Sequence, residues 1–303
     1  MMHDFLMSLV PWGTDAIIWV QGFRTPALDS FFKAVTFLGQ QEFYLLALPF
    51  IYWVIDKSVG ARLAFALLPG AYLNDWLKDL FSIPRPDPAR VAWLVEETTF
   101  AFPSGHTQNS TVLFGFLAAR VRRWLSWALS ALLVVGVAFS RVYLGVHYPQ
   151  DLLGGLFFGV AYLLFFFWLE KPVSGWFSHQ NLVVRLILVF LAPILLLLLH
   201  PTKDTAVAMA SLACSGVAYV LEGEWIRFDV SGLWWRRALR FLVGMALALV
   251  AFLGLRAVLP EGLLSRSVHY GCVALTGGLI APWVFVKTGL AASEGKSVTE
   301  ASR

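Results

Sequence analysis

The chain alternates between long runs of apolar residues and short polar connections along most of its length. A helix needs about 20 apolar residues to cross the hydrocarbon core of a bilayer. Runs approaching or reaching that length predict membrane spans at about 42–56, 59–80, 104–120, 124–141, 149–170, 182–200, 205–222, 238–259 and 267–287. The pattern therefore predicts an all-α fold, a polytopic integral membrane bundle of helices.

The first 40 residues follow this pattern less clearly. Residues 5–20 are apolar but contain Pro11, Gly13 and Asp15, so the sequence leaves open whether they span the membrane. Residues 26–38 carry large apolar side chains at helical spacing, which predicts an amphipathic helix lying in the membrane interface.

A polar stretch at 170–181 is the clearest interruption of the apolar pattern. We use it to divide the chain into three parts. Residues 1–40 hold N-terminal apolar and interfacial helices, residues 41–171 form a core module, and residues 182–290 form an additional membrane module. The last module holds about four helices, and the sequence gives it no role.

Composition supports a membrane protein and excludes two other classes. Hydrophobic residues make up 58% of the chain and charged residues 14%, whereas a soluble domain has about 45–50% and about 25%. A soluble enzyme and a disordered chain are both excluded by this balance. The net charge of +4 fits basic residues collected in cytoplasmic loops, and we expect no nucleic-acid partner.

The basic residues also predict an orientation. If the span at 59–80 runs from inside to outside, most of the 23 lysine and arginine residues fall in inside loops. The basic turn at 118–124 is the strongest anchor. We expect an inner membrane of a bacterium, with the outer ends of the spans facing the periplasm.

Three polar clusters fall at the predicted outer ends of the spans. Charged residues at this depth are costly and are usually functional. The clusters have the patterns K-x6-RP, PSGH and SR-x5-H-x3-D, and their chemically informative members are Lys78, Arg85, Ser104, Gly105, His106, Arg141, His147 and Asp151. Cys214 and Cys272 belong to no metal-binding motif, and we expect no metal site and no cofactor.

Each cluster alone has a structural explanation. Lys78 and Arg85 could extend to the interface, and the PSGH tetrapeptide could simply begin a helix. Glu96 and Glu97 precede that tetrapeptide, and we interpret them as solvated loop residues in preference to residues that select a substrate. The combination of three cations, two histidines and one carboxylate favours a functional site.

The set suits phosphoryl transfer. Lys78, Arg85 and Arg141 can surround the oxygens of a phosphate, and a helix that begins at Ser104 offers backbone N–H groups to an anion. A carboxylate that accepts a hydrogen bond from one ring nitrogen of a histidine leaves the other nitrogen available as a nucleophile. Asp151 and His147, four residues apart, fit that pairing.

These residues and spacings resemble the tripartite signature of the type 2 phosphatidic acid phosphatase superfamily, over roughly residues 42–170. The resemblance implies a helical membrane core and a metal-free phosphatase that works through a phosphohistidine. It makes His147 the nucleophile, Asp151 its orienting partner and His106 the acid–base group. It assigns the phosphate cradle to Lys78, Arg85, Ser104, Gly105 and Arg141.

We therefore expect a hydrolase that acts on a lipid phosphate or diphosphate at the non-cytoplasmic face. Two alternatives remain. One is a lipid phosphotransferase that uses the same phosphohistidine, and the other is a non-enzymatic protein that binds or moves lipids. The sequence identifies neither the lipid nor the oligomeric state.

Overall fold

The computed structural model describes residues 2–294, and within that part of the chain it contains helices and no β-strand. One isolated bridge pairs Phe228 with Ser293. In chain order the elements are α1 (Met2–Ser8), α2 (Val10–Gln21), α3 (Pro26–Phe37), α4 (Gln41–Phe50), η1 (Ile51–Ile55), α5 (Lys57–Phe81), α6 (Gly105–Val121), α7 (Trp124–Tyr143), α8 (Pro149–Ser178), α9 (Leu182–Leu199), α10 (Lys203–Leu221), η2 (Glu222–Ile226), α11 (Trp234–Val258), α12 (Leu263–Leu275), η3 (Thr276–Ile280) and α13 (Ala281–Lys287).

The all-α prediction is confirmed, and each predicted span is helical. Six helical segments are long and apolar enough to cross a membrane: Trp124–Tyr143, Pro149–Ser178, Leu182–Leu199, Lys203–Ile226, Trp234–Val258 and Leu263–Lys287. The polar connection expected at 170–181 is shorter than predicted, because α8 continues to Ser178. Pro172 removes only one backbone donor, and the helix passes through it.

Three predicted spans fall outside that apolar set. The segment at 42–56 is helical and apolar but shorter, as Gln41–Ile55. The other two, α5 and the 17-residue α6, carry polar side chains that are buried in protein. Asn74 of α5 donates from Nδ2 to Oε1 of Gln108 of α6 at 2.9 Å. Gln108 in turn donates from Nε2 to the carbonyl oxygen of Gly70 at 2.9 Å. These bonds satisfy both amides inside the protein, which lowers the apolar content that the two helices need.

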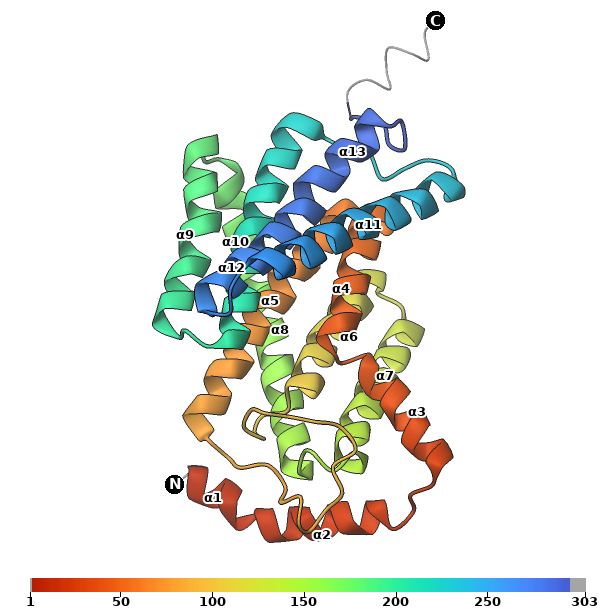
Figure 1. The fold of residues 1–303 in the computed structure, drawn as a ribbon, viewed down its shortest axis with the longest axis vertical. Helices are drawn as coiled ribbons and strands as arrows, with labels where there is room; N and C mark the ends of the chain where they lie inside the picture. The colour runs from red at the N-terminus through yellow and green to blue at the C-terminus, as the bar shows by residue number, and fades with distance from the viewer. Residues whose placement is uncertain (1, 295–303) are drawn as a thin grey trace, which may run out of the picture. The chain divides into compact units, whose positions relative to one another are not determined.

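The chain forms two compact units, and the first contains Met1–Tyr44 and Gly70–Glu170. Figure 1 shows α6, α7 and α8 in this unit, with α1 and α2 lying across one end of α7 and α8. The end of α2 is fixed to this region by Gln21, which donates to the carbonyl oxygens of Ala92 and Tyr143 at 2.7 and 3.1 Å. The predicted helix at 26–38 exists as α3, and it packs along α7 through Phe32 and Tyr143.

Glycines allow α8 to approach α6 closely. A Cβ atom on Gly155 would lie 2.6 Å from the carbonyl oxygen of Ser104, and one on Gly159 would lie 2.9 Å from Cβ of Thr111. Small residues spaced four apart permit this kind of close helix packing in membranes. The contact places the first turn of α8 beside the start of α6.

The second unit contains Leu45–Pro69 and Lys171–Arg303, of which the structure describes the part up to residue 294. Its α10 packs against α9 and α12. Trp53 is buried in its core and donates from Nε1 to the carbonyl oxygen of Gly277 at 3.0 Å. Residues 45–69, which we placed in the 41–171 module, thus belong to this unit. The division of function between the modules stays a prediction.

The contact of Gly155 predicts different effects of two matched substitutions in α8 on the free energy of unfolding. Gly155→Ala should lower the free energy of unfolding by about 1–3 kcal/mol, because the added methyl group meets backbone of α6. Gly175→Ala should leave it unchanged or raise it by up to about 1 kcal/mol, since nothing lies within 4 Å of that Cβ position. Thermal unfolding of both variants in one detergent checks this, and equal melting temperatures would contradict the packing.

Candidate active site

The predicted site residues lie at the ends of α5, α6, α7 and α8 and in the connections between these helices. The long connection between α5 and α6 runs over the same ends of α7 and α8 as α2 does (Figure 1). Backbone bonds fix it there: Leu94 donates to the carbonyl oxygen of Leu144 at 3.1 Å, and Ala101 donates to that of Ile83 at 2.8 Å.

His147 is buried and makes a hydrogen bond with each ring nitrogen. Its Nδ1 lies 3.2 Å from Oδ2 of Asp151, and its Nε2 lies 3.0 Å from Nη1 of Arg85. A guanidinium can only donate, so Nε2 must be the acceptor, and the proton of the neutral ring must sit on Nδ1. The contacts therefore select the tautomer whose Nε2 lone pair points toward the arginine.

Asp151 is held in place by backbone on both sides. The backbone N–H of Tyr148 donates to its Oδ2 at 2.8 Å, and its own carbonyl oxygen accepts from the backbone N–H of Ser104 at 3.0 Å. The second bond joins the first turn of α8 to the residue that caps α6. The PSGH tetrapeptide and the His–Asp pair are therefore coupled through one backbone hydrogen bond.

The PSGH tetrapeptide begins α6, as the sequence predicted. The hydroxyl of Ser104 accepts from the backbone N–H of Thr107 at 3.4 Å and caps the helix. A Cβ atom on Gly105 would lie 2.8 Å from Oδ1 of Asn74, so a larger residue there would displace the Asn74 side chain. Nε2 of His106 is buried and has no hydrogen-bond partner among the described residues, which leaves it available to a ligand.

Arg141 is fully buried and lies between α3 and the connection before α6. It donates from Nη1 to Oγ1 of Thr36 at 2.8 Å and pairs through Nη2 with Glu97. Glu97 also pairs with Nη2 of Arg85 at 3.1 Å. One carboxylate thus bridges two of the three cations that we assigned to the phosphate cradle.

The third cation, Lys78, reaches the same connection. Its Nζ donates to Oγ1 of Thr99 at 2.6 Å. Arg85 donates from Nε to the carbonyl oxygen of Thr99 at 2.6 Å. The predicted cradle residues Lys78, Arg85 and Arg141 are therefore brought together around Glu97 and Thr99.

Sequence reasoning missed three polar neighbours of the cradle: Thr36, Glu97 and Thr99. The interpretation of Glu97 as a solvated loop residue is wrong, because its side chain is 20% exposed and pairs with two arginines. A signal was present, since a carboxylate between motifs expected to gather three cations is a natural ion-pair partner. No sequence signal pointed to Thr36.

The electrostatic surroundings keep His147 neutral. Burial, followed by the charges of Arg85, Arg141 and Lys78, holds the pKa of His147 well below its ordinary value of 6.5. His147 lies in the connection between α7 and α8, outside the spanning segments. A neutral ring whose Nε2 carries a lone pair is the form that a nucleophile requires.

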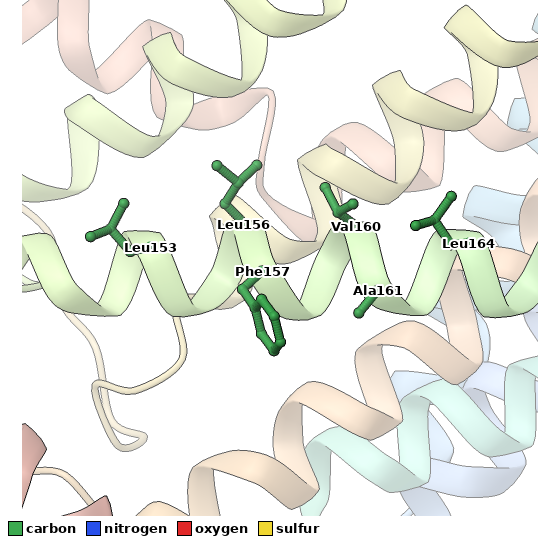
Figure 2. Close-up of a pocket in the computed structure, with 6 residues that line it drawn as sticks. All are labelled: Leu153, Leu156, Phe157, Val160, Ala161 and Leu164. Carbon is green, nitrogen blue, oxygen red and sulfur yellow. The ribbon is translucent and has the colours of Figure 1, made fainter.

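An open, apolar groove lies along an exposed face of α8. It has a volume of about 340 Å³. Figure 2 shows the six side chains that line it, all on α8: Leu153, Leu156, Phe157, Val160, Ala161 and Leu164. Its side chains are exposed, Leu153 at 68%, whereas Asp151 is fully buried.

No group of three histidine, cysteine, aspartate or glutamate side chains is arranged to hold a metal ion within residues 2–294. The absence of a metal requirement stays a prediction.

Comparison with known proteins identifies the family. A model of the PAP2 superfamily matches residues 60–173, and a model of the PAP2 superfamily phosphatase transmembrane extension matches residues 206–293. Phosphatidylglycerophosphatase B of Bacillus subtilis is 31% identical over 156 residues, which cover 47% of this chain and 74% of the relative. The chain belongs to the PAP2 superfamily. The first match contains every predicted site residue.

Other relatives cover less of their own length. Lipid phosphate phosphatase delta of Arabidopsis thaliana is 30% identical over 204 residues, or 59% of this chain and 49% of the relative. The chain spans about half the length of the first curated relatives that it matches. A crystal structure of a transmembrane PAP2-type phosphatidylglycerolphosphate phosphatase from Bacillus subtilis has a TM-score of 0.48 and 25% identity, and covers 55% of this chain and 88% of that one.

The PAP2 transmembrane extension and the six apolar helices make this PAP2 chain an integral, multi-pass membrane protein. The predicted additional module at 182–290 overlaps the region that matches the extension over residues 206–290.

The hydrogen bonds of His147 predict its nuclear magnetic resonance signature. The ring should carry its proton on Nδ1 at pH 7.5 and should titrate well below pH 6.5, because burial and three nearby cations disfavour the imidazolium. Ring ¹⁵N shifts of the detergent-solubilised protein measure both properties, and the signal that disappears in His147→Gln assigns them. Protonation at or above pH 6.5, or a proton on Nε2, would contradict the geometry.

Proposed function

We propose that this PAP2 protein is a lipid phosphate phosphatase that forms a phosphohistidine on His147. The contact chain from Asp151 through His147 to Arg85 carries the proposal. It supplies a neutral imidazole, an oriented Nε2 lone pair and a cation next to the nitrogen that would attack phosphorus.

In the first step, Nε2 of His147 attacks the phosphorus atom and the bond from phosphorus to the lipid oxygen breaks. Asp151 accepts the hydrogen bond from Nδ1 and stabilises the positive ring that forms. His106, in its protonated form, gives a proton to the departing lipid oxygen, so the products are a lipid alcohol and phosphohistidine. The unpartnered Nε2 of His106 is available to the lipid oxygen. Burial disfavours the charged form of this ring, so the proposal requires the negative charge of the bound phosphate to favour its protonation.

In the second step, the now neutral His106 accepts a proton from water as the water oxygen attacks phosphorus. The bond from phosphorus to His147 breaks, and inorganic phosphate leaves. Both steps need positive charge around the phosphate oxygens, where charge accumulates. Lys78, Arg85 and Arg141 would supply it without a metal ion, and the N–H groups at the start of α6 would add to it.

Three observations support a lipid substrate. The site lies at the ends of α7 and α8, which are apolar enough to span a membrane. The groove along α8 is lined by exposed apolar side chains, which suit contact with lipid. The names of the relatives include a lipid phosphate phosphatase, a probable sphingosine-1-phosphate phosphatase and a phosphatidylglycerophosphatase. A headgroup at the helix ends would leave its tails along the bilayer.

Replacing the proposed nucleophile tests this function. His147→Ala should lower phosphate release from a short-chain lipid phosphate by roughly a thousandfold or more, since loss of a covalent nucleophile can cost about 10⁶. The assay contains excess EDTA, because the proposed site needs no metal. His179→Ala, at an exposed histidine, is the matched control. Wild-type-like release by the His147 variant, or complete loss of wild-type activity in EDTA, would refute the proposal.

The same assay separates hydrolysis from transfer. With labelled substrate and an added lipid alcohol, a hydrolase should release the label as inorganic phosphate and not pass it to the alcohol. A predominantly labelled alcohol would indicate the phosphotransferase instead.

The proposal places the site on the non-cytoplasmic face of a bacterial inner membrane, from the distribution of basic residues. Cysteines introduced at exposed Arg90 and Arg122, in a chain with Cys214 and Cys272 replaced by serine, should label from opposite sides. Residue 90 lies in the connection over the site, and residue 122 lies just past the other end of α6. An impermeant thiol reagent on intact cells should reach only residue 90, and labelling of residue 122 alone would reverse the orientation.

A further inference from the structure

The carboxylate of Glu97 lies where an anionic ligand of the two arginines would be expected. Its Oε2 lies 3.1 Å from Nη2 of Arg85, and its Oε1 pairs with Nη2 of Arg141. The two arginine side chains are 6% and 1% exposed, whereas that of Glu97 is 20% exposed. A carboxylate and a phosphate present the same paired oxygens to a guanidinium, so the two would compete for the same donors.

Glu97 lies on a short segment that is fixed at both ends. We call residues 95–100 the strap. On one side Leu94 bonds to Leu144, and on the other side Ala101 bonds to Ile83. The strap also carries Thr99, which accepts hydrogen bonds from Lys78 and Arg85. All three proposed cradle cations therefore bond to the strap.

The strap also bears on the proposed nucleophile. Arg85 donates from Nη1 to Nε2 of His147 and from Nη2 to Glu97. The guanidinium that Glu97 holds is thus the one that covers the attacking lone pair. Movement of Arg85 onto a phosphate would release both the carboxylate and the lone pair.

We propose that Glu97 competes with phosphate for the guanidinium groups of Arg85 and Arg141. We call the position between these two groups the phosphate seat. This inference rests on the proposed function and adds a residue that sets substrate affinity and product release. When a ligand binds, Glu97 leaves the arginines; when phosphate departs, Glu97 returns and neutralises them. The apparent dissociation constant of every anion at this seat is then raised by the same factor, the inverse of the fraction of molecules with an open seat.

An equal increase in the dissociation constants of all anions would affect how the site responds to the surrounding phospholipids. Most bilayer phospholipids are phosphodiesters with one negative charge, and they surround the site at high local concentration. A phosphate monoester carries about −1.5 to −2 at pH 7 and binds cations more strongly. Uniform weakening therefore keeps diester headgroups below saturation while the monoester still binds, and it also hastens the release of phosphate.

An alternative role for Glu97 predicts the opposite result. If its carboxylate only holds Arg85 and Arg141 in position, removing its charge should loosen the cradle and weaken anion binding. If it is a competitor, removing the charge should strengthen anion binding. The direction of change in affinity therefore separates the two roles.

The test uses the full chain in detergent and inorganic phosphate as the probe, measured by calorimetry. Glu97→Gln keeps the side-chain shape and removes the charge, and it should lower the dissociation constant of phosphate about tenfold if the seat is open in a tenth of molecules. Glu96→Gln, at the exposed neighbouring carboxylate, is the matched control and should leave it unchanged. An unchanged or raised dissociation constant in Glu97→Gln would overturn the proposal.

Two further arms complete the experiment. The inhibition constant of phosphatidylglycerol against hydrolysis of short-chain phosphatidic acid should fall in Glu97→Gln by the same factor as that of phosphate. If this variant fails to fold, Glu97→Asp replaces it, because aspartate keeps the charge but has a shorter side chain. The dissociation constant of phosphate should then fall by a smaller factor. Weaker phosphate binding in Glu97→Asp would refute the proposal. Because phosphate binding is measured directly, an inactive wild type would refute the proposed function and leave the test of Glu97 intact.

Discussion

The burial of Arg141 is the constraint on which the site depends. A guanidinium removed from water needs acceptors for its N–H groups and a compensating negative charge, because an uncompensated buried charge costs several kcal/mol. Thr36 supplies one acceptor from α3, and Glu97 supplies the charge from the connection before α6. Two segments far apart in the sequence are thereby drawn to the end of α7. The connection over the site is held by this ion pair as well as by its backbone bonds.

Close packing of α6 and α8 provides the second requirement, which is precise placement of the His–Asp pair. Gly155 lets the backbone of α8 meet that of α6, and Ser104 bonds to the carbonyl oxygen of Asp151. Because the helix start and the carboxylate are joined by backbone, a shift of one moves the other. The proposed nucleophile and the proposed anion-binding helix end therefore keep one geometry.

The sequence predicted the helices and the polar clusters well, because both follow from local patterns. Apolar runs reported the helices, and motif spacing located Lys78, His106 and His147 at their ends. It failed for Glu97 and Thr36, since a solvated loop and a buried ion pair look alike until the fold brings the partners together. It also placed residues 45–69 with the site-bearing part, whereas Trp53 packs in the core of the other unit. Such pairings are decided by contacts between distant segments, which hydrophobic periodicity does not encode.

The contacts of Arg85 and Glu97 also bear on how a ligand would gain access to the site. Arg85 covers the lone pair of His147 and Glu97 covers Arg85 and Arg141, so the proposed nucleophile and these two cations are all bonded to protein groups. A ligand that draws Arg85 toward itself frees the lone pair in the same movement that vacates the seat. An anion too weak to displace Glu97 would leave the nucleophile covered. Under the proposed function, substrate binding and activation of His147 would therefore be one event, because a single guanidinium takes part in both contacts.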